Sequence, residues 1–574
     1  MKFDDVLKQI GEFGPYQKRV FFLTALPSVL SAFEAISVVF TFNIPNHRCA
    51  IPGYPNDHFH VTNTSYASIL NQSVPRQLDG TFSKCRLYSD VSNDVIVSNV
   101  QDAKWSNRTD DGFNETSYSA SRNTDDCTKW VYDHSVFETT IASDFDVVCD
   151  RSVLRASSNL IAELGCLFGT FVCGFVADRF GRKIPFYIGG LALVAGGFGI
   201  AFTDNFIALN VCRFVLGMAR LALWVNGMVI GMEIVGPSKR VFVGIFMELS
   251  WCLGMLLLLI FTYFIRNWRY LEIALSVPSI FLLAYWWLIP ESPRWLASKG
   301  REKEALQVLE KIAASNKTKL PEVDDVTSLL DADKCLSFKF IFTSRELIVR
   351  MLIIFSNMFV LCVIYYALIL NITNLAGDIY INYLLSVIVE TVGFGVPYFL
   401  LDRMGRKPVY CIAIMVAGFC CVISLVPDIL GAPDWVVVTL SMIGRFCVCI
   451  CYSVIYMFGA ELFPTVIRGS AMGMGVTFSR IGGLLSPYLA DVGILIGGRL
   501  ENSLPLVVMG SPALVVGLFA LWLPETMGTK LPETLDDVNN LHSKRGCFCC
   551  QKNKPDVRET IVNRNKDALA SSPC

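Results

Sequence analysis

Ionisable residues interrupt several long apolar stretches of this 574-residue chain, which is 53% hydrophobic and only 17% charged. A charged side chain inside a bilayer is costly, so each of these residues is a candidate for handling a charged ligand. A carboxylate attracts an ammonium group, whereas a guanidinium group holds a carboxylate through two parallel hydrogen bonds. The candidates are Glu34, Glu248, Glu390, Arg480, Arg213, Arg220 and Arg445, with Glu461 at the end of its stretch.

Two central charges of opposite sign stand out among these candidates. Glu390 is about eleven residues into its apolar stretch, roughly 16 Å at 1.5 Å per residue, and Arg480 is equally central in its own. Acidic groups together with an arginine favour a ligand that carries both an ammonium and a carboxylate. The alternatives are an ion pair between Arg480 and Glu390, or between Glu390 and an arginine of a neighbouring helix, that no ligand contacts.

Twelve apolar stretches of about 20 residues, the length that spans a bilayer, position these side chains. They lie near 20–44, 156–177, 184–203, 206–231, 241–265, 270–289, 347–370, 379–401, 408–426, 435–459, 469–495 and 503–523. Lys and Arg gather in the short loops near 179–183 and 403–407, so we expect these loops and both termini to face the cytoplasm. The sequence therefore predicts an all-α, multi-pass membrane protein with twelve transmembrane helices.

The polar segment 45–150 is external in this topology. It holds four sequons for glycosylation, at Asn63, Asn71, Asn107 and Asn114. It also holds four cysteines, Cys49, Cys85, Cys127 and Cys149. An even number of cysteines in an oxidising compartment indicates two disulfides, for which three connectivities exist. We expect a large glycosylated and disulfide-bonded extracellular loop.

The chain repeats itself at a nearly constant offset. The sequence DRFGRK at 178–183 recurs as DRMGRK at 402–407, and Pro290-Glu291-Ser292 recurs as Pro524-Glu525-Thr526. Arg213-Phe214 likewise recurs as Arg445-Phe446. The repeat predicts two six-helix halves in tandem, a transporter design in which substrate binds between the halves near the bilayer midplane.

The duplicated loop also predicts a gate at the cytoplasmic ends of the helices. Its glycines let helix ends approach closely, and its charges can pair across neighbouring helix ends. The residues concerned are Asp178, Arg179, Gly181, Arg182, Asp402, Arg403, Gly405 and Arg406. The alternative is that the basic residues set the topology alone.

The sequence GFVADRFGRK at 174–183 resembles the loop motif of the major facilitator superfamily. Within it, the chain resembles the organic cation, carnitine and organic anion transporters over nearly its whole length. The motifs are NHRC at 46–49, PESPRWL at 290–296, AELFPTVIR at 460–468 and LPET at 531–534. It is most similar to the carnitine-type branch, in YFIRNWR at 263–269 and GDIYIN at 377–382.

The resemblance implies a polyspecific plasma-membrane transporter of small organic cations or carnitine-like zwitterions that works by alternating access. Glu390 resembles an acidic residue of the cation and carnitine carriers, and Arg480 resembles an arginine of the anion and carnitine carriers. Trp224 and Tyr365 resemble aromatic residues of the family's binding site, although a lone aromatic can also serve packing. Ser31 stands where sodium-coupled carnitine carriers have asparagine, so the coupling ion stays open.

The expected organisation is a first half over 1–289, a cytoplasmic linker over 290–346, a second half over 347–523 and a cytoplasmic tail over 524–574. The expected partners are a small organic ion and the lipid bilayer. The balanced charge, Lys+Arg 49 against Asp+Glu 50, argues against nucleic acid. With five histidines and no catalytic motif, the chain is expected to be no enzyme and to use no cofactor or metal. An organic anion transporter, a non-transporting receptor and a channel are the alternatives.

Overall fold

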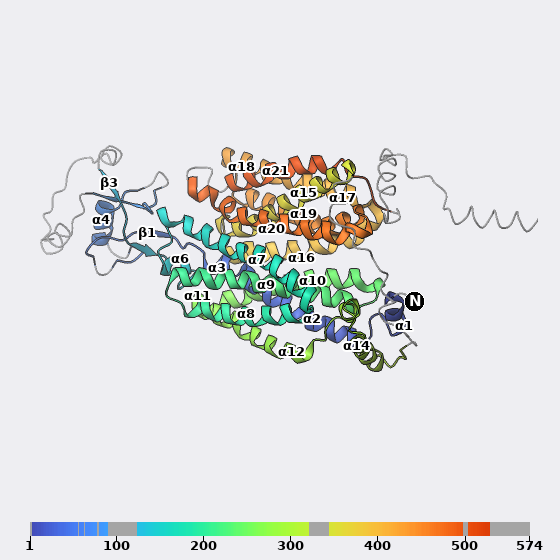
Figure 1. The fold of residues 1–574 in the computed structure, drawn as a ribbon. Helices are drawn as coiled ribbons and strands as arrows, with labels where there is room; N and C mark the ends of the chain where they lie inside the picture. The colour runs from blue at the N-terminus through green and yellow to red at the C-terminus, as the bar shows by residue number, and fades with distance from the viewer. Residues whose placement is uncertain are drawn as a thin grey trace, which may run out of the picture.

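A computed structural model describes residues 3–54, 57–61, 64–76, 80–89, 123–320, 344–496 and 503–527. Most of these residues are helical, and the long helices run side by side (Figure 1). Ten helical ranges are long and apolar enough to cross a membrane, and α20 and α21 complete the set of twelve. The 28 residues of α7 make a helix about 42 Å long, more than the roughly 30 Å of a bilayer's apolar core. The predicted fold class is confirmed.

The long helices fall into two sets of six. The first set is α2 (Pro15–Ile36), α7 (Val153–Phe180), α8 (Lys183–Phe202), α9 (Phe206–Ile234), α10 (Arg240–Phe264) and the broken span α11 (Trp268–Ser276), η3 (Val277–Ala284) and α12 (Tyr285–Leu288). The second set is α15 (Arg345–Leu370), α16 (Ile379–Met404), α17 (Arg406–Ile423), α19 (Trp435–Leu462), α20 (Thr465–Ile496) and α21 (Leu504–Ala520). The sets pack against each other through α7 on α20 and α10 on α16.

Shorter elements lie at the two ends of the bundle (Figure 1). One end carries β1 (His47–Cys49), β2 (Arg86–Tyr88), β3 (Thr124–Asp126), β4 (Trp130–Tyr132), α4 (Thr64–Ser73), α6 (Ile141–Asp144) and η1 (Cys149–Arg151), and we call it the loop end. The other end carries α1 (Phe3–Gln9), α13 (Pro293–Ser298) and α14 (Glu302–Ser315), and we call it the linker end. The remaining short elements are α3 (Val38–Thr41), η2 (Pro237–Lys239), η6 (Asn371–Asn374) and α18 (Leu425–Leu430).

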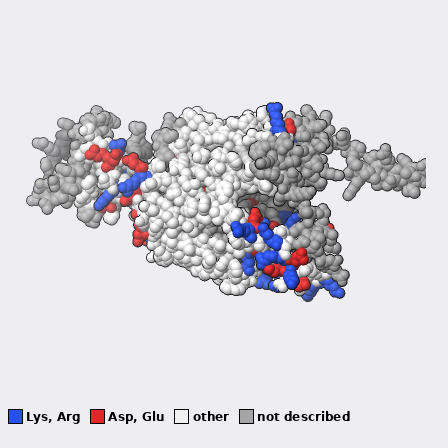
Figure 2. Space-filling model, viewed as in Figure 1, with Lys and Arg blue, Asp and Glu red and all other residues white. Residues whose placement is uncertain are grey.

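Charge follows the same division. Figure 2 shows charged side chains gathered at the two ends, with a broad belt of uncharged side chains between them. Many large apolar side chains of the long helices point outward, such as Phe175 of α7, Phe264 of α10 and Phe399 of α16, which are 64%, 77% and 70% exposed. An apolar outer surface of this extent is what a lipid-facing helix bundle requires.

The loop end is held together by two disulfides, one between Cys49 and Cys127 and the other between Cys85 and Cys149. Of the three connectivities that the sequence left open, the structure selects this one. β1 pairs antiparallel with β4, and β2 with β3. Asn71 is exposed on α4, whereas the sequons at Asn63, Asn107 and Asn114 lie outside the described residues.

A buried polar cluster also fixes the loop-end fold. The Arg48 guanidinium group contacts the carboxylate of Asp57, and the Tyr66 hydroxyl donates to the same carboxylate. Burial and the hydrogen bond to Asp57 raise the pKa of Tyr66 to about 12. The Tyr66 hydroxyl therefore stays protonated, and remains a donor, throughout the physiological pH range.

Candidate functional site

A cavity lies between the two sets of helices, near the middle of the bundle. Its empty volume is about 500 Å³. Residues from α9 and α10 line one side, and residues from α15, α16, α19 and α20 line the other. The lining residues are Arg220, Leu221, Trp224, Glu248, Trp251, Tyr365, Tyr366, Phe394, Tyr452 and Arg480. We call this space the central cavity. Four of the six residues predicted to bind substrate, Glu248, Arg480, Trp224 and Tyr365, meet here.

Arg480 brings a positive charge into the central cavity. Its Nη1 donates to the Tyr366 hydroxyl at 3.0 Å, and its buried Nε has no hydrogen-bond partner. No described carboxylate lies within 4 Å of this guanidinium group. Because a buried charge without a partner is costly, Arg480 is left able to bind an anionic group.

Glu248 supplies a negative charge to the same cavity from the opposite set of helices. It is partly exposed to the cavity and makes no ion pair within 4 Å with a described residue. Aromatic rings surround both charges, and those of Tyr365 and Tyr452 lie 5.1 Å apart between centroids. Aromatic faces attract organic cations. The central cavity thus offers separate positions for an ammonium, a carboxylate and an apolar body.

Glu390 lies behind this cavity rather than in it. The Glu390 carboxylate is 0% exposed, forms an ion pair with Arg445 of α19 and accepts a hydrogen bond from Tyr365 at 2.6 Å. The Arg445 guanidinium also lies 5.4 Å from the centre of the Tyr365 ring. Of the alternatives that the sequence left open, the geometry favours a pair with a neighbouring arginine, and that arginine is Arg445, not Arg480.

Glu461 is also outside the central cavity. It lies in the last turn of α19 at the linker end, where its Oε2 lies 3.4 Å from Nε of Arg406 and accepts a hydrogen bond from Thr526 at 2.5 Å. Its prediction as a substrate-binding residue is not supported by this position, because its carboxylate is engaged at the helix ends.

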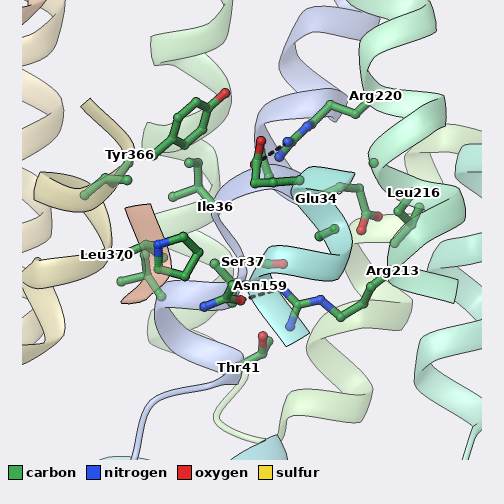
Figure 3. Close-up of a pocket in the computed structure, with 18 of the residues that line it drawn as sticks. Glu34, Ile36, Ser37, Thr41, Asn159, Arg213, Leu216, Arg220, Tyr366 and Leu370 are labelled. Carbon is green, nitrogen blue, oxygen red and sulfur yellow. Dashed lines mark hydrogen bonds and ion pairs between the residues drawn. The ribbon is translucent and has the colours of Figure 1, made fainter. Parts of the chain in front are cut away.

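A second cavity lies toward the loop end, and we call it the upper cavity. Its empty volume is about 770 Å³. Figure 3 shows Glu34, Arg213, Arg220 and Asn159 around it. The Arg213 guanidinium donates to Asn159 at 2.7 Å, and that of Arg220 donates to Glu163 at 2.8 Å. Arg220 and Tyr366 line both cavities, so the two are neighbours.

The duplicated loops at the linker end have matching geometry in the two sets of helices. The Glu291 carboxylate accepts from the backbone N–H groups of Arg182 and Lys183 at 2.9 and 3.3 Å. The Glu525 carboxylate accepts from those of Arg406 and Lys407, both at 3.0 Å. An acidic group at the start of a helix satisfies free N–H groups and stabilises the helix dipole. This explains why the Pro-Glu motif recurs together with the loop.

The aspartates of these loops pair with arginines of the same loop, four residues further along the chain. Asp178 pairs with Arg182 at 2.8 Å, and Asp402 lies 3.8 Å from Arg406. Both aspartates face solvent, being 77% and 85% exposed. Gly181 and Gly405 have φ values of 107° and 93°, where glycine is favoured. The loops therefore brace neighbouring helix ends within each set. Their role as a gate stays a prediction.

We expect Glu291→Ala and Glu525→Ala each to lower stability by about 1 kcal/mol, the usual cost of losing a helix cap. Gly181→Ala should be costlier, because a Cβ there would lie 2.1 Å from the Glu291 carboxylate. Thermal unfolding of the purified protein measures both effects. Lys299→Ala, an exposed position at the same end, is the matched control. Unchanged unfolding of both capping variants would contradict this role.

The sequence did not identify the contacts that join the two sets at the loop end. Arg155 of α7 donates to Asp491 of α20 through Nε at 3.1 Å and through Nη2 at 2.5 Å. Both side chains are buried. Phe40 stacks on Tyr380 of α16, with ring centroids 5.8 Å apart. Asp491 interrupts an apolar stretch, and Arg155 directly precedes another. Two opposite charges at such positions are the sequence signal from which an ion pair between them could have been predicted.

Comparison with known proteins agrees with this architecture. The xylose transporter XylE from E. coli, in a partially occluded inward-open conformation, superposes with a TM-score of 0.58 at 15% identity. That likeness covers 90% of this chain and all of the other. The proton:xylose symporter XylE of the major facilitator superfamily, bound to 6-bromo-6-deoxy-D-glucose, superposes with a TM-score of 0.53 at 21% identity, over 68% of this chain and 90% of the other. At these identities the likeness shows the fold alone.

Sequence comparison is more specific. Residues 108–536 match the family described as "Sugar (and other) transporter". The "Organic cation transporter protein" of Drosophila melanogaster is 34% identical, over 95% of this chain and 96% of its own. The "Organic cation/carnitine transporter 2" of Homo sapiens is 32% identical, over 93% of this chain and 94% of its own. The chain therefore belongs to the sugar (and other) transporter family of multi-pass membrane proteins, which are transporters and not enzymes, and within it to the group of the organic cation and carnitine transporters.

Proposed function

We propose that this protein carries small organic cations and zwitterions of the carnitine type across the plasma membrane by alternating access. The observation that carries the proposal is the pair of opposite charges, Glu248 and Arg480, in one aromatic cavity between the two sets of helices. Neither forms an ion pair with a described residue. The names of the relatives, organic cation and organic cation/carnitine transporters, support the same class of substrate.

The substrate's two ends would meet matched partners in the central cavity. A quaternary ammonium group fits between Glu248 and the faces of Trp224 and Tyr365, because it needs no hydrogen-bond acceptor. A carboxylate fits the free edge of the Arg480 guanidinium group. Since these groups come from both sets of helices, a bound substrate would tie the sets together. Their relative movement would then expose the substrate to one side of the membrane or the other.

The division of the chain that we propose follows from this mechanism. Residues 1–289 and 347–523 are the two moving halves, joined by a cytoplasmic linker over 290–346 and followed by a tail over 524–574. Both termini and the linker end face the cytoplasm, and the loop end is extracellular. The residues of the two duplicated loops brace the cytoplasmic ends of each half. They also close the cytoplasmic side in the state in which the central cavity is open to the extracellular side.

We expect Asn71 to carry a glycan, because it lies in a sequon and is exposed at the loop end. Asn71→Gln should increase the electrophoretic mobility of protein from expressing cells, and changing Asn63, Asn107 and Asn114 as well should abolish sensitivity to glycosidase. Asn316→Gln, in the sequon Asn316-Lys317-Thr318 at the linker end, is the control. It should change nothing, because we propose that this end faces the cytoplasm, where sequons are not used. Unaltered mobility of the fourfold variant would contradict an external loop end.

The decisive test of the substrate class is Arg480→Asp. This change removes the carboxylate partner and adds a second acidic group to a cavity that already holds Glu248. We expect uptake of a zwitterion such as carnitine to fall by at least tenfold, and uptake of a matched cation without a carboxylate to be retained or to rise. A loss of about 1.4 kcal/mol of binding energy corresponds to tenfold, and a charge-assisted hydrogen bond contributes about 1.5–3 kcal/mol.

Uptake is measured in expressing cells with both probes and with an organic anion, normalised to surface protein. Arg480→Lys is the matched control, since it keeps the charge but loses the planar fork, and it should weaken zwitterion uptake less than Arg480→Asp. An unchanged preference in a well-expressed Arg480→Asp protein would show that selectivity lies elsewhere. Preferred uptake of the anion by the wild type would favour the organic anion transporter instead, and no uptake of any probe would favour a receptor.

A further inference from the structure

The upper cavity contains two carboxylates that the proposed substrate site does not use. Glu34 lies near the end of α2, and Glu272 lies on α11, where it is 2% exposed. Glu34 Oε1 and Glu272 Oε2 are both buried without a hydrogen-bond partner. Ser276 Oγ, on the same helix as Glu272, is also buried without a partner. Buried polar atoms are nearly always satisfied, so these oxygens indicate a missing ligand.

Gly197 of α8 lies against two of the three unpartnered oxygens, those of Ser276 and Glu34. A Cβ at this position would lie 2.2 Å from Ser276 Oγ and 3.1 Å from Glu34 Oε1. The bare glycine backbone therefore makes room for a serine hydroxyl and a glutamate oxygen in the same small space. This arrangement comes from three separate helices and does not depend on one acidic cluster along the chain.

The surrounding charges do not balance. The titratable groups that line the upper cavity are Glu34 from α2, Glu163 from α7, Arg213 and Arg220 from α9, Glu272 from α11 and Tyr366 from α15. Cys166 of α7 adjoins Arg220. Arg220 is held by Glu163, and Arg213 by Ser158 and Asn159. Neither guanidinium group lies within 4 Å of Glu34 or Glu272. Three carboxylates thus face two guanidinium groups, and the surplus is one negative charge.

A single proton would remove this surplus. Two carboxylates that share a site of low dielectric cannot both ionise cheaply, and such a pair retains one proton. A metal ion would need several oxygen or nitrogen ligands around one point. The described residues contain no group of three or more His, Cys, Asp or Glu side chains that could hold a metal ion. A proton needs only one oxygen lone pair, which both glutamates offer.

We propose that Glu34 and Glu272 form a binding site for one proton that is taken up and released with each transport cycle, so that the carrier is proton-coupled. This deepens the proposed function and rests on it. Shared residues connect the proton site to the substrate site. Arg220 and Tyr366 line both cavities, and Tyr366 accepts the hydrogen bond of Arg480. The charge state of the upper cavity therefore acts on the substrate-binding arginine through shared neighbours.

The test uses purified full-length protein in liposomes, with labelled carnitine as the probe and the membrane potential clamped. For one proton per neutral zwitterion, a gradient of one pH unit supports roughly tenfold accumulation. The wild type is expected to accumulate carnitine inside the liposomes when a proton gradient is imposed, because protons moving down their gradient drive the uptake. Glu34→Gln and Glu272→Gln keep the side-chain shape and should lose this accumulation, yet should retain exchange of carnitine at equal pH within about twofold. Glu304→Gln, at a half-exposed position of α14 at the linker end, should retain both activities.

Exchange separates this proposal from the proposed function. One contrary result is a wild type that exchanges carnitine at equal pH yet fails to accumulate it in response to a proton gradient. That result, or accumulation driven by a sodium gradient at fixed pH, overturns the proton site and leaves the proposed transporter intact. Failure of exchange with every probe overturns the proposed function. In that case infrared difference spectra between acid and alkaline pH still decide on the proton itself. The carbonyl band of a protonated carboxyl should be present in the wild type and absent in both glutamine variants, and a band unchanged in both would refute the site.

Discussion

Arg445→Met is expected to cost the protein about 3–5 kcal/mol of stability, the penalty for leaving a buried charge without its partner. The partner is Glu390, which is 0% exposed, and Arg445 is 2% exposed. The Tyr365 hydroxyl stabilises the same carboxylate from the cavity side. Once the guanidinium group is gone, this single hydrogen bond cannot offset the desolvation of a full charge in the membrane interior. We therefore expect poor surface expression and a strongly lowered unfolding temperature in detergent.

The double variant Arg445→Met with Glu390→Gln should recover most of this loss, because a neutral pair has no charge to desolvate and Gln still accepts from Tyr365. Recovery of folding together with uptake would establish that the pair supports the cavity wall. Recovery of folding with a specific loss of cation uptake would instead return Glu390 to the binding site. Arg301→Met is the matched control: Arg301 forms an ion pair with Glu304 in which both side chains are about half exposed, and such pairs contribute about 0–1 kcal/mol. If Arg445→Met unfolds no more readily than Arg301→Met, the pair is not structurally important.

This pair also shows how far the sequence reaches. Residue counts along an apolar stretch give the depth of a side chain, at 1.5 Å per residue. By this count Glu390 and Arg480 were both predicted to lie near the middle of the bundle, and both do. Residue counts do not give the direction of the side chain around the helix axis. That direction follows from how α16 packs on α19, a contact between segments 55 residues apart at Glu390 and Arg445. The sequence therefore found both charges but could not choose Arg445 as the partner.

Repeated motifs were more informative than single charges. The recurrence of the loop near 178 at 402, and of Pro290-Glu291 at 524–525, marks positions where each half repeats the same local contact. The capping of α8 by Glu291 and of α17 by Glu525 is that contact. The pairing of four cysteines, in contrast, depends on which of them the folded loop end brings together. Their spacing in the sequence therefore could not show that Cys49 pairs with Cys127. The carboxylates of the upper cavity were visible as charges, but their lack of partners was not.

The second large effect is expected at the loop end, where Arg155 and Asp491 join the two halves. Their two hydrogen bonds, at 3.1 and 2.5 Å, form a bidentate pair between α7 and α20, and such pairs combine strength with fixed geometry. Alternating access requires that this end separate when the cavity opens to the loop side. The pair must then break, and both charges become hydrated. It therefore stabilises the state that is closed at the loop end, and only that state.

Arg155→Ala and Asp491→Ala should each shift the balance toward the state that is open at the loop end, by tenfold for every 1.4 kcal/mol lost. We expect uptake to slow by at least tenfold, because the carrier would close this end less often. The exchanged pair, Arg155→Asp with Asp491→Arg, should restore a substantial part of the rate, since the charges remain complementary. Access is measured with a membrane-impermeant thiol reagent added outside cells that express Ser486→Cys, a buried position lining the upper cavity, with the protein lacking this cysteine as the background. The single variants should label faster than the Ser486→Cys protein alone, and the exchanged pair should label at nearly its rate. Equal labelling of all these proteins would show that other contacts, such as Phe40 on Tyr380, hold this end closed.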